Sequence, residues 1–550
     1  PDKQEIIGFN NDVFSHTISP ELKNFKGYFV MQFNKPFKTY GTWSDSILNP
    51  NSRKEKGVFT GAYFTFKTEA NEVVEVKIGT SFISIEEARK SIHWEIGTRS
   101  FDYMKKEGRD YWNNALSKIK IESENEEQKT LFYTFMFHAQ QYPREIHEGK
   151  MHYSAAFDKV KPGKGYTDFS LWDTYRAEHP LLLYIAPERV NDMIKGMLEH
   201  FDGTGRLPIW PNPMETNIMI GSHADPVIAD AYIKGFKGYD VQKAYQAIKK
   251  DGTIPPPNDD NNPWGDRDPW TTPEGRGGLK HYLEKGYVAI DKTKEAPART
   301  LEYAYDDYCI AQMAKALGFK EDYEMFMKQS KNYKNTFDPE QGYFMARRSD
   351  GSFSKDTTEG FTEGVHWMYA FWAPHDIPGM IELYGGREKF TEKLDLYYKV
   401  QGYKPHGNEQ VHHYPFLYNY VGKPEKTQEA IINTLKTYKN TPWGIGNDDC
   451  GQMSAWYVFN TIGFYPVCPS DETYVIGRPM VKKAVIKLNN FYKKGDFTMI
   501  AENFSEENIY IQSATLNGKP LENPYIKHAE IINGGTLKFV MGNTPGTIWK

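Results

Sequence analysis

The chain has 550 residues, a formal net charge of −5 and a hydrophobic content of 39%. These values exclude a disordered or fibrous protein, and the length predicts about two to four domains. Basic residues occur only in short runs such as Lys482-Lys483, which argues against nucleic acid as a partner. No stretch of about 18 apolar residues is present, so we expect no transmembrane segment.

Cysteine and aromatic content add two further expectations. Cys309, Cys450 and Cys468 lie far apart and follow no metal-ligand spacing, so we expect free thiols, with a single disulfide as the alternative. The 37 Tyr, 33 Phe and 12 Trp residues can fill a large core, and aromatic faces also stack on sugar rings. The chain begins at Pro1 with no signal peptide, and we interpret it as a processed or trimmed piece whose start reveals no compartment.

The first domain is predicted to be an antiparallel β-sandwich over residues 1–84. β-Branched and aromatic residues alternate at 28–33, 61–66 and 73–78, and turns rich in Gly, Asn and Pro separate these runs. We expect the first strands of this sandwich to be missing. A helical pattern follows Ser84 with a capping-type start, and we interpret residues 85–122 as linker helices.

Helices dominate residues 123–464. The apolar-periodic segments, about a dozen, include 187–201, 300–317 and 451–462, and long loops rich in Gly, Pro and Asp separate them. This pattern favours an (α/α)6 toroid as the catalytic domain, because a toroid carries such loops at the open end of its funnel. A helical solenoid is the alternative, although no fixed repeat period is present. Strand patterns return in residues 465–550, which predicts a small C-terminal β domain.

The loop before segment 451–462 carries a concentrated set of polar groups. Residues 442–456 read PWGIGNDDCGQMSAW, with Asn447 before the adjacent carboxylates of Asp448 and Asp449. One interpretation is that Asn447 or Asp448 caps the helix. The other is a ligand site, because a cap needs one side chain and the glycines let the backbone approach a ligand. A carboxylate at a helix N-terminus stays ionised, which suits a general base.

A second candidate acid is Glu363, in residues 361–367 (FTEGVHW). An aromatic neighbourhood would keep it protonated, as a general acid requires, and the alternative is a charge that stabilises a helix N-terminus. Asp173 and Arg176 likewise lie at a predicted helix start, where capping and an ion pair between them are the alternative explanation. Two carboxylates in separate loops of one funnel are what glycoside hydrolysis requires.

Residues 406–414 (HGNEQVHHY) combine one acid, two amides and three His side chains. No zinc motif of the His-Glu-x-x-His type is present. Oxygen ligands from Glu409, Asn408 or Gln410 would suit a hard cation such as calcium. A satisfied polar cluster without a metal is the alternative.

Six motifs, in order within residues 160–470, together resemble glycoside hydrolase family 92. They are LWDTYR (171–176), GSHAD (221–225), YAYDD (303–307), TEG (362–364), GNEQVHH (407–413) and GNDDCGQMSAW (446–456). The family consists of exo-acting α-mannosidases that depend on calcium and invert the anomeric centre. The resemblance therefore implies an N-terminal β-sandwich, an (α/α)6 catalytic domain, small β elements after it, and Ca²⁺ as cofactor.

The resemblance also implies roles for single residues. Glu363 is expected to be the catalytic acid and Asp449 the catalytic base. Relatives often have Asp where this chain has Asn447, which leaves Asp449 as the strong candidate for the base. The predicted metal ligands are Glu409, Gln410 and Asn447. The predicted substrate-binding residues are Trp172, Asp173, Arg176, His223, Asp225, Asn408, His412 and Asp448.

The implied substrate is a mannose-containing oligosaccharide or a glycoprotein glycan, such as an N-glycan or mannan. The linkage stays open, because members associated with α-1,2 bonds carry His before the Glu that matches Glu409, and this chain has Asn408. Family habit predicts a secreted, periplasmic or cell-surface location.

Two other functions remain as alternatives. One is another (α/α)6 glycosidase, such as an α-glucosidase or a trehalase-like enzyme, which would use a different acid pair and no metal. The other is a non-catalytic carbohydrate-binding protein. The presence of both Glu363 and Asp449 argues against the second alternative, because a binding module has no use for a protonated acid opposite a base.

Overall fold

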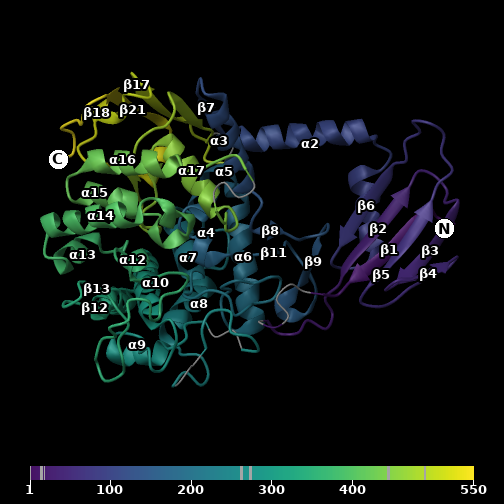
Figure 1. Cartoon of the computed structure of the whole chain (residues 1–550), viewed down its shortest axis with the longest axis horizontal. Helices are drawn as coiled ribbons and strands as arrows, with labels where there is room; N and C mark the ends of the chain where they lie inside the picture. The colour runs from purple at the N-terminus through teal and green to yellow at the C-terminus, as the bar shows by residue number, and fades with distance from the viewer. Residues whose placement is uncertain are drawn as a thin grey trace. The chain divides into compact units, whose positions relative to one another are not determined.

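The computed structural model describes residues 2–12, 17, 19–260, 264–271, 275–441, 446–488 and 491–550. Residues 442–445, the start of the predicted acid-bearing loop, lie outside the described residues. The chain forms two compact units. The first contains Glu21–Tyr111, Ile146–Gly165 and the segment before residue 17, and the second contains Trp112–Glu145 and Tyr166–Lys550 (Figure 1).

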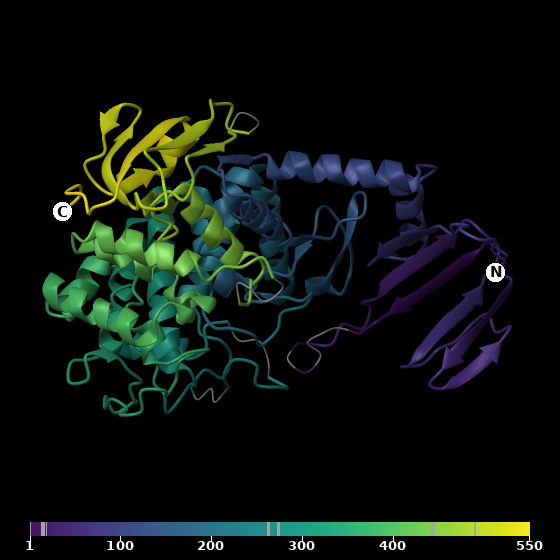
Figure 2. The same ribbon diagram turned by 45° about the horizontal axis from the view of Figure 1, so that its top comes forward.

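The first unit contains two three-stranded antiparallel sheets, with strand orders β1-β2-β6 and β4-β3-β5 (Figure 2). One of the predicted strands is displaced, since β6 begins at Val76 and not at residue 73. The strands of these two sheets are β1 (Glu5–Asn10), β2 (Gly27–Phe33), β3 (Thr39–Ser44), β4 (Ile47–Pro50), β5 (Thr60–Thr65) and β6 (Val76–Ser81). A separate antiparallel pair is formed by β9 (Met151–Ser154) and β10 (Lys159–Pro162).

Aromatic packing joins the two sheets. The ring centroids of Phe33 on β2 and Phe64 on β5 are 4.7 Å apart, and Phe37 and Phe66 pack on both rings. Such offset or edge contacts add about 0.5–1.5 kcal/mol per pair beyond the apolar area they bury. Two helical elements, α1 (Ile85–Ser91) and a short π-helix (Ile92–Ile96), complete this unit together with the first turns of α2 (Phe101–Leu116). The predicted cap of α1 is confirmed, because the Ser84 hydroxyl accepts a hydrogen bond from the Glu87 amide.

Helices make up most of the second unit, and their ends follow the sequence signals. Pro occupies the first turn of α6, α10 and α16, while α6, α10 and α17 end on a left-handed Gly. The helices are α3 (Glu126–His138), α4 (Leu171–Thr174), α5 (Glu178–Ile185), α6 (Pro187–Thr204), α7 (Ala224–Ile233), α8 (Val241–Thr253), α9 (Leu279–Lys285), α10 (Ala296–Leu317), α11 (Lys320–Gln329), α12 (His366–Tyr369), α13 (Ile377–Leu383), α14 (Arg387–Gln401), α15 (Leu417–Tyr420), α16 (Pro424–Leu435), α17 (Gln452–Ile462) and α18 (His528–Ile532).

The C-terminal strands form a six-stranded sheet that belongs to the same unit as the helices, with the order β19-β18-β21-β17-β16-β7. It lies over α16 and α17 in both views, and the Ile511 amide of β18 donates to Gln428 of α16 (Figures 1 and 2). Its strands are β7 (Ile119–Glu122), β16 (Lys483–Ile486), β17 (Phe497–Glu502), β18 (Tyr510–Leu516), β19 (Lys519–Pro520) and β21 (Gly535–Gly542). Strand β7 comes from the segment interpreted as linker helices, so that part of the prediction is corrected.

Shorter strands connect the helices. They pair as β8 (Arg144–Glu145) with β11 (Tyr166–Thr167), β12 (Phe337–Asp338) with β13 (Tyr343–Phe344), and β14 (Phe464–Tyr465) with β15 (Thr473–Ile476) and β20 (Tyr525–Lys527). All three cysteines are free, as expected. Within the described part of the chain, every helix is too short or too polar to cross a membrane.

Candidate active site

Asp173 lies on α4, a single helical turn that begins after Ser170. The Ser170 hydroxyl donates to Oδ2 of Asp173, and the Asp173 residue is only 2% exposed. The other carboxylate oxygen, Oδ1, is buried and has no hydrogen-bond partner. An unpaired buried carboxylate oxygen costs free energy. A ligand that bound Oδ1 of Asp173 would remove that cost.

Glu409 and Gln410 present further unpaired oxygen atoms. Glu409 begins a short 3₁₀ helix and is fully buried, and neither of its carboxylate oxygens has a hydrogen-bond partner. The side-chain oxygen of Gln410 is also buried and unpaired, while its Nε2 donates to the carbonyl of Thr362 over 3.0 Å. The side-chain oxygens of Glu409 and Gln410 are therefore buried acceptors that receive no hydrogen bond, which is the arrangement expected around a cation.

The two adjacent acids in the loop before α17 have different hydrogen-bond partners. Asp448 accepts hydrogen bonds from the amide of Ser454 at 2.9 Å and from its hydroxyl at 2.8 Å, so Asp448 serves the helix. Asp449 instead accepts a hydrogen bond from the side chain of Asn447. Asp449 and Cys450 have φ angles of 43° and 57°, a left-handed backbone that is uncommon for residues with side chains. Such strain persists where the surrounding structure enforces it, often at functional sites.

Glu363 also has a left-handed backbone, with φ of 48°. The hydroxyl of Tyr369 donates to the carbonyl of Thr362 over 2.7 Å and holds this loop. The Glu363 carboxyl accepts a hydrogen bond from Asn408 Nδ2 at 3.2 Å and lies 2.8 Å from Nη1 of Arg267. The contacts of this carboxyl are polar, and they differ from the aromatic neighbourhood that the sequence suggested.

Three carboxyl groups come together at this point. Oxygen atoms of Asp173, Glu409 and Asp449 lie within 4.8 Å of one another. Burial raises the pKa of Asp449 to about 6, and the charges of Glu363 and Asp448 add to that effect. Burial and the charge of Asp449 likewise raise the pKa values of Asp173 and Glu409. A hard divalent cation would relieve this repulsion and satisfy the unpaired oxygens, so the residues present fit calcium.

Arg176 is the cation that the chain itself places beside the cluster, where its charge acts on Asp173 and Glu409. Its guanidinium lies 5.0 Å from the centre of the Trp172 ring, and its Nε donates to the Trp172 carbonyl over 3.1 Å. Trp172 is fully buried. The structure therefore places Trp172 behind Arg176.

Two of the predicted substrate-binding residues, His223 and Asp225, are fully buried. His223 lies against two acids, with Nδ1 2.8 Å from Asp306 and Nε2 3.1 Å from Glu302. Asp225 pairs with Arg276, whose Nη2 is 3.0 Å from Oδ2 of the acid. The structure does not bring either side chain to the carboxyl cluster, and both lie in a network of paired charges.

His412 is also buried and bonded to protein groups. Its Nδ1 lies 3.0 Å from the side-chain nitrogen of Gln452, and its Nε2 lies 3.3 Å from the carbonyl of His406. Gln452 in turn accepts a hydrogen bond from the Ala177 amide at 2.9 Å. Gln452 of α17 thus connects His412 to the segment that follows Arg176. Asn408, Asn447 and Gln410 do contact the candidate acids or their loops, as described above.

Comparison with protein families shows which family the chain belongs to. The model of the glycosyl hydrolase family 92 catalytic domain matches residues 87–543, and that of the family's N-terminal domain matches residues 1–81. The chain belongs to glycosyl hydrolase family 92. The resemblance to this family that the sequence motifs indicated is confirmed.

Solved structures of family 92 confirm the predicted fold class as well. The inverting mannosidase BT2199 of Bacteroides thetaiotaomicron VPI-5482 is 30% identical, with a TM-score of 0.90 over 100% of this chain and 76% of that one. The α-mannosidase BT3965 of Bacteroides thetaiotaomicron is 33% identical, with a TM-score of 0.86 over 99% of this chain and 73% of that one. A relative in Arthroderma benhamiae, described as an uncharacterized secreted glycosidase, is 28% identical over 534 residues, and the chain spans 62% of its length.

Sequence reasoning missed two residues of this candidate site. Arg267 contacts the carboxyl of Glu363, and Glu302 accepts a hydrogen bond from Trp172 Nε1 at 3.0 Å. A signal existed for Arg267, because residues 264–270 (WGDRDPW) place a dense set of charges between two Trp residues. Glu302 carried a weaker signal, since it lies in α10 one position before the YAYDD motif (303–307).

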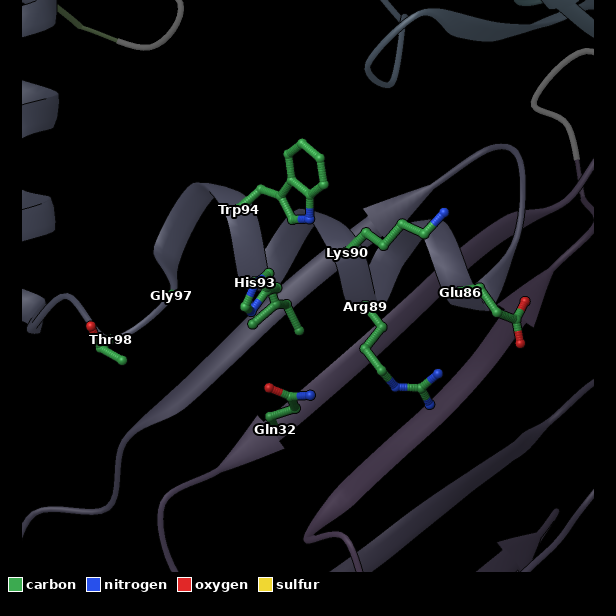
Figure 3. Close-up of a pocket in the computed structure, with 9 residues that line it drawn as sticks. Gln32, Glu86, Arg89, Lys90, His93, Trp94, Gly97 and Thr98 are labelled. Atoms are coloured by element: carbon green, nitrogen blue, oxygen red, sulfur yellow. The ribbon is translucent and has the colours of Figure 1, made fainter.

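A separate hollow in the first unit contains none of the predicted site residues. It lies between β2, α1 and the short π-helix, with Gln32, Arg89 and Trp94 on its walls (Figure 3). Trp94 is 76% exposed, whereas Arg89 is held by Glu5, with Nη2 3.0 Å from the carboxylate. The chemistry predicted from the sequence therefore belongs to the second unit.

Proposed function

We propose that this chain carries the catalytic machinery of a calcium-dependent, exo-acting, inverting α-mannosidase. The observation that carries the proposal is the cluster of Asp173, Glu409 and Asp449, whose oxygens lie within 4.8 Å of one another. Two similar solved structures, one of an inverting mannosidase and one of an α-mannosidase, support the same activity. The second of those proteins has also been solved with mannoimidazole.

In the proposed reaction, Glu363 donates a proton to the glycosidic oxygen, and Asp449 takes a proton from the attacking water on the opposite face of the sugar. The bond from the anomeric carbon to the leaving oxygen breaks while the bond to water forms, so an α-mannoside yields β-mannose. Asn408, which donates to Glu363, orients the acid. Asn447, which donates to Asp449, orients the base.

Glu409 and Asp173 are proposed to hold the cation, with Gln410 and Asn447 as further oxygen donors. Support comes from the unpaired buried oxygens of Asp173, Glu409 and Gln410. When bound, calcium would supply a Lewis acid for two hydroxyls of the mannose ring. Arg176 would then bind a further hydroxyl of the terminal sugar.

We infer that the substrate is a mannose-containing oligosaccharide or a glycoprotein glycan, with the linkage not fixed. The inferred location is secreted, periplasmic or on the cell surface, in line with a relative described as secreted. A non-catalytic carbohydrate-binding role would leave the left-handed backbone at Glu363 and Asp449 without a purpose.

Release of free mannose from α-1,2-, α-1,3-, α-1,4- and α-1,6-mannobioses, with calcium and with a chelator, tests the proposal. We expect release from at least one disaccharide, loss of release with the chelator, and recovery on addition of calcium. Release of glucose from maltose or trehalose that persists with chelator would favour an (α/α)6 glucosidase. No release from any substrate, with mannose binding retained, would favour a binding protein.

A further inference from the structure

A chain of buried charges runs behind the candidate active site. His223, at the start of α7, lies between two acids of α10, with Nδ1 2.8 Å from Asp306 and Nε2 3.1 Å from Glu302. Burial alone lowers the pKa of His223, but Asp306 and Glu302 outweigh it and raise the pKa to about 9. His223 is therefore a cation at neutral pH. Arg276 supports the far end of this chain, because its Nη2 lies 3.9 Å from Asp306.

Glu302 is the point where this chain meets the site. Its Oε1 accepts a hydrogen bond from Trp172 Nε1 at 3.0 Å and lies 3.7 Å from Nη2 of Arg176. Glu302 is fully buried, so solvent does not screen these contacts. Arg176 therefore lies beside Glu302, and its charge also interacts with those of Asp173 and Glu409.

How strongly the Arg176 guanidinium interacts with each of these carboxylates affects the cation site. If Glu302 lost its charge, the guanidinium would keep only Asp173 and Glu409 as counter-charges and would pair with them more fully. It would then compete with a bound cation for the same oxygen atoms. Partners outside the ligand set are known to tune metal affinity in this way, by about 10–100-fold.

We propose that Glu302, held by His223 and Asp306, is a positioning residue that keeps Arg176 away from Asp173 and Glu409 and so preserves the affinity of the carboxyl cluster for a divalent cation. This inference rests on the proposed cation site. It assigns His223 a supporting role behind Arg176, in place of the direct contact with substrate that the sequence suggested.

The test compares two isosteric substitutions on the same helix, Glu302→Gln and Asp307→Asn. Asp307 is as fully buried as Glu302, and it pairs with Nη1 of Arg276 at 2.6 Å and with the Tyr282 hydroxyl at 2.7 Å. Calcium alone is titrated by calorimetry into the chelator-stripped 550-residue chain, with no substrate present. We expect Glu302→Gln to weaken calcium binding by about tenfold or more and Asp307→Asn to leave the affinity of the wild type.

Glu302→Asp serves as a second variant, because it keeps the charge but withdraws the carboxylate from Arg176. Its calcium affinity should fall between that of the wild type and that of Glu302→Gln, and it keeps the test available if Glu302→Gln does not fold. Equal affinity in the wild type, Glu302→Asp and Asp307→Asn would overturn the inference, as would an equal loss in the Glu302 and Asp307 variants. A wild type that binds no calcium would overturn the cation proposal itself, and this inference with it.

Discussion

The helical unit buries two groups of acids whose surroundings differ. Asp225 and Asp307 pair with Arg276, whose nitrogens lie 3.0 and 2.6 Å from their carboxylates, and Asp306 lies beside His223. In the candidate site, by contrast, Oδ1 of Asp173 and both carboxylate oxygens of Glu409 have no hydrogen-bond partner. Both groups include residues of motifs that drew attention in the sequence.

The difference follows from the free energy of burying charge. A buried carboxylate needs a counter-charge or hydrogen-bond donors, or it becomes protonated. The group around Arg276 contains its own cations, since Arg276 lies 3.0 Å from Asp225 and His223 lies 2.8 Å from Asp306, and it stabilises the fold even though Oδ1 of Asp225 has no hydrogen-bond partner. The charge of Arg176 acts on the group around Glu409, but neither carboxylate oxygen of Glu409 has a hydrogen-bond partner, which indicates that a further partner comes from outside the chain. The predictions below address this contrast.

The largest effect is expected for Asp449→Asn. Loss of a general base should lower kcat by about 10⁴-fold on any mannoside, whatever the leaving group, because an amide cannot accept the proton of the attacking water. Steady-state kinetics on a mannobiose and on an aryl mannoside measure it. Asp448→Asn is the matched control, since the neighbouring acid bonds to Ser454 of α17 and should keep most of the activity. Similar losses in both variants would contradict the assignment.

Glu363→Gln should lower the rate on a mannobiose by about 10³-fold and much less on an aryl mannoside whose leaving group needs no proton. The ratio of the two rate losses is the measurement. Glu359→Gln changes an acid of the same loop that pairs with Arg348, at 3.4 Å between Oε2 and Nη2, and should leave both rates unchanged. Equal loss on both substrates would remove Glu363 from the acid role.

Arg276→Met should act on stability. It leaves Asp225 and Asp307 without their cation, and breaking a buried pair costs about 3–5 kcal/mol of unfolding free energy. Urea denaturation of the calcium-loaded chain measures the loss. The activity of the molecules that remain folded should be close to that of the wild type. Wild-type stability in this variant would show that Arg276 does not support the buried acids.

A third kind of buried acid sharpens the comparison. Glu215 is compensated by backbone amides, since it accepts hydrogen bonds from Ile209 and Trp210 at 2.8 Å and from Thr216 at 3.2 Å. Burial outweighs these bonds and raises the pKa of Glu215 from 4.5 to about 7. Burial also lowers the pKa of the neighbouring His200 to about 4, so His200 stays neutral over most of that range.

At Glu215 the folded state therefore binds more protons than the unfolded state between pH 4.5 and about 7, whereas His200 acts in the opposite direction between about pH 4 and 6.5. The contribution of Glu215 is fully present below pH 4.5 and falls by about 3 kcal/mol as the pH rises through 7. In Glu215→Gln this part of the pH dependence should disappear from unfolding curves recorded between pH 4.5 and 8. An unchanged slope would contradict the assignment.

Local signals predicted the helices well. The segment 187–201 corresponds to α6 and 451–462 to α17, because apolar spacing, Pro at the start and Gly at the end are read within one helix. Strand β7 was missed because its partner, β16, lies more than 350 residues away in the chain, as the pairing of Glu122 with Lys483 shows.

The same difference between local signals and long-range contacts applies to the candidate site. The resemblance to family 92 identified Glu363, Glu409 and Asp449 from local motifs, and the cluster then joined Asp173 to the last two. The motif around His223 looked alike but belongs to the paired network. Only contacts across the fold distinguish the two motifs. In the motif around His223, Asp225 pairs with Arg276 and His223 pairs with Glu302, whereas the carboxylate oxygens of Glu409 have no hydrogen-bond partner.

The configuration of the first product tests the central claim most directly, that Glu363 and Asp449 act as acid and base on opposite faces of the sugar. Proton NMR during hydrolysis of an α-mannoside, in the presence of calcium, follows the anomeric signal before mutarotation. The account predicts that β-mannose appears first. Initial formation of α-mannose would show retention and would contradict it, because retention requires a nucleophile where we place a base.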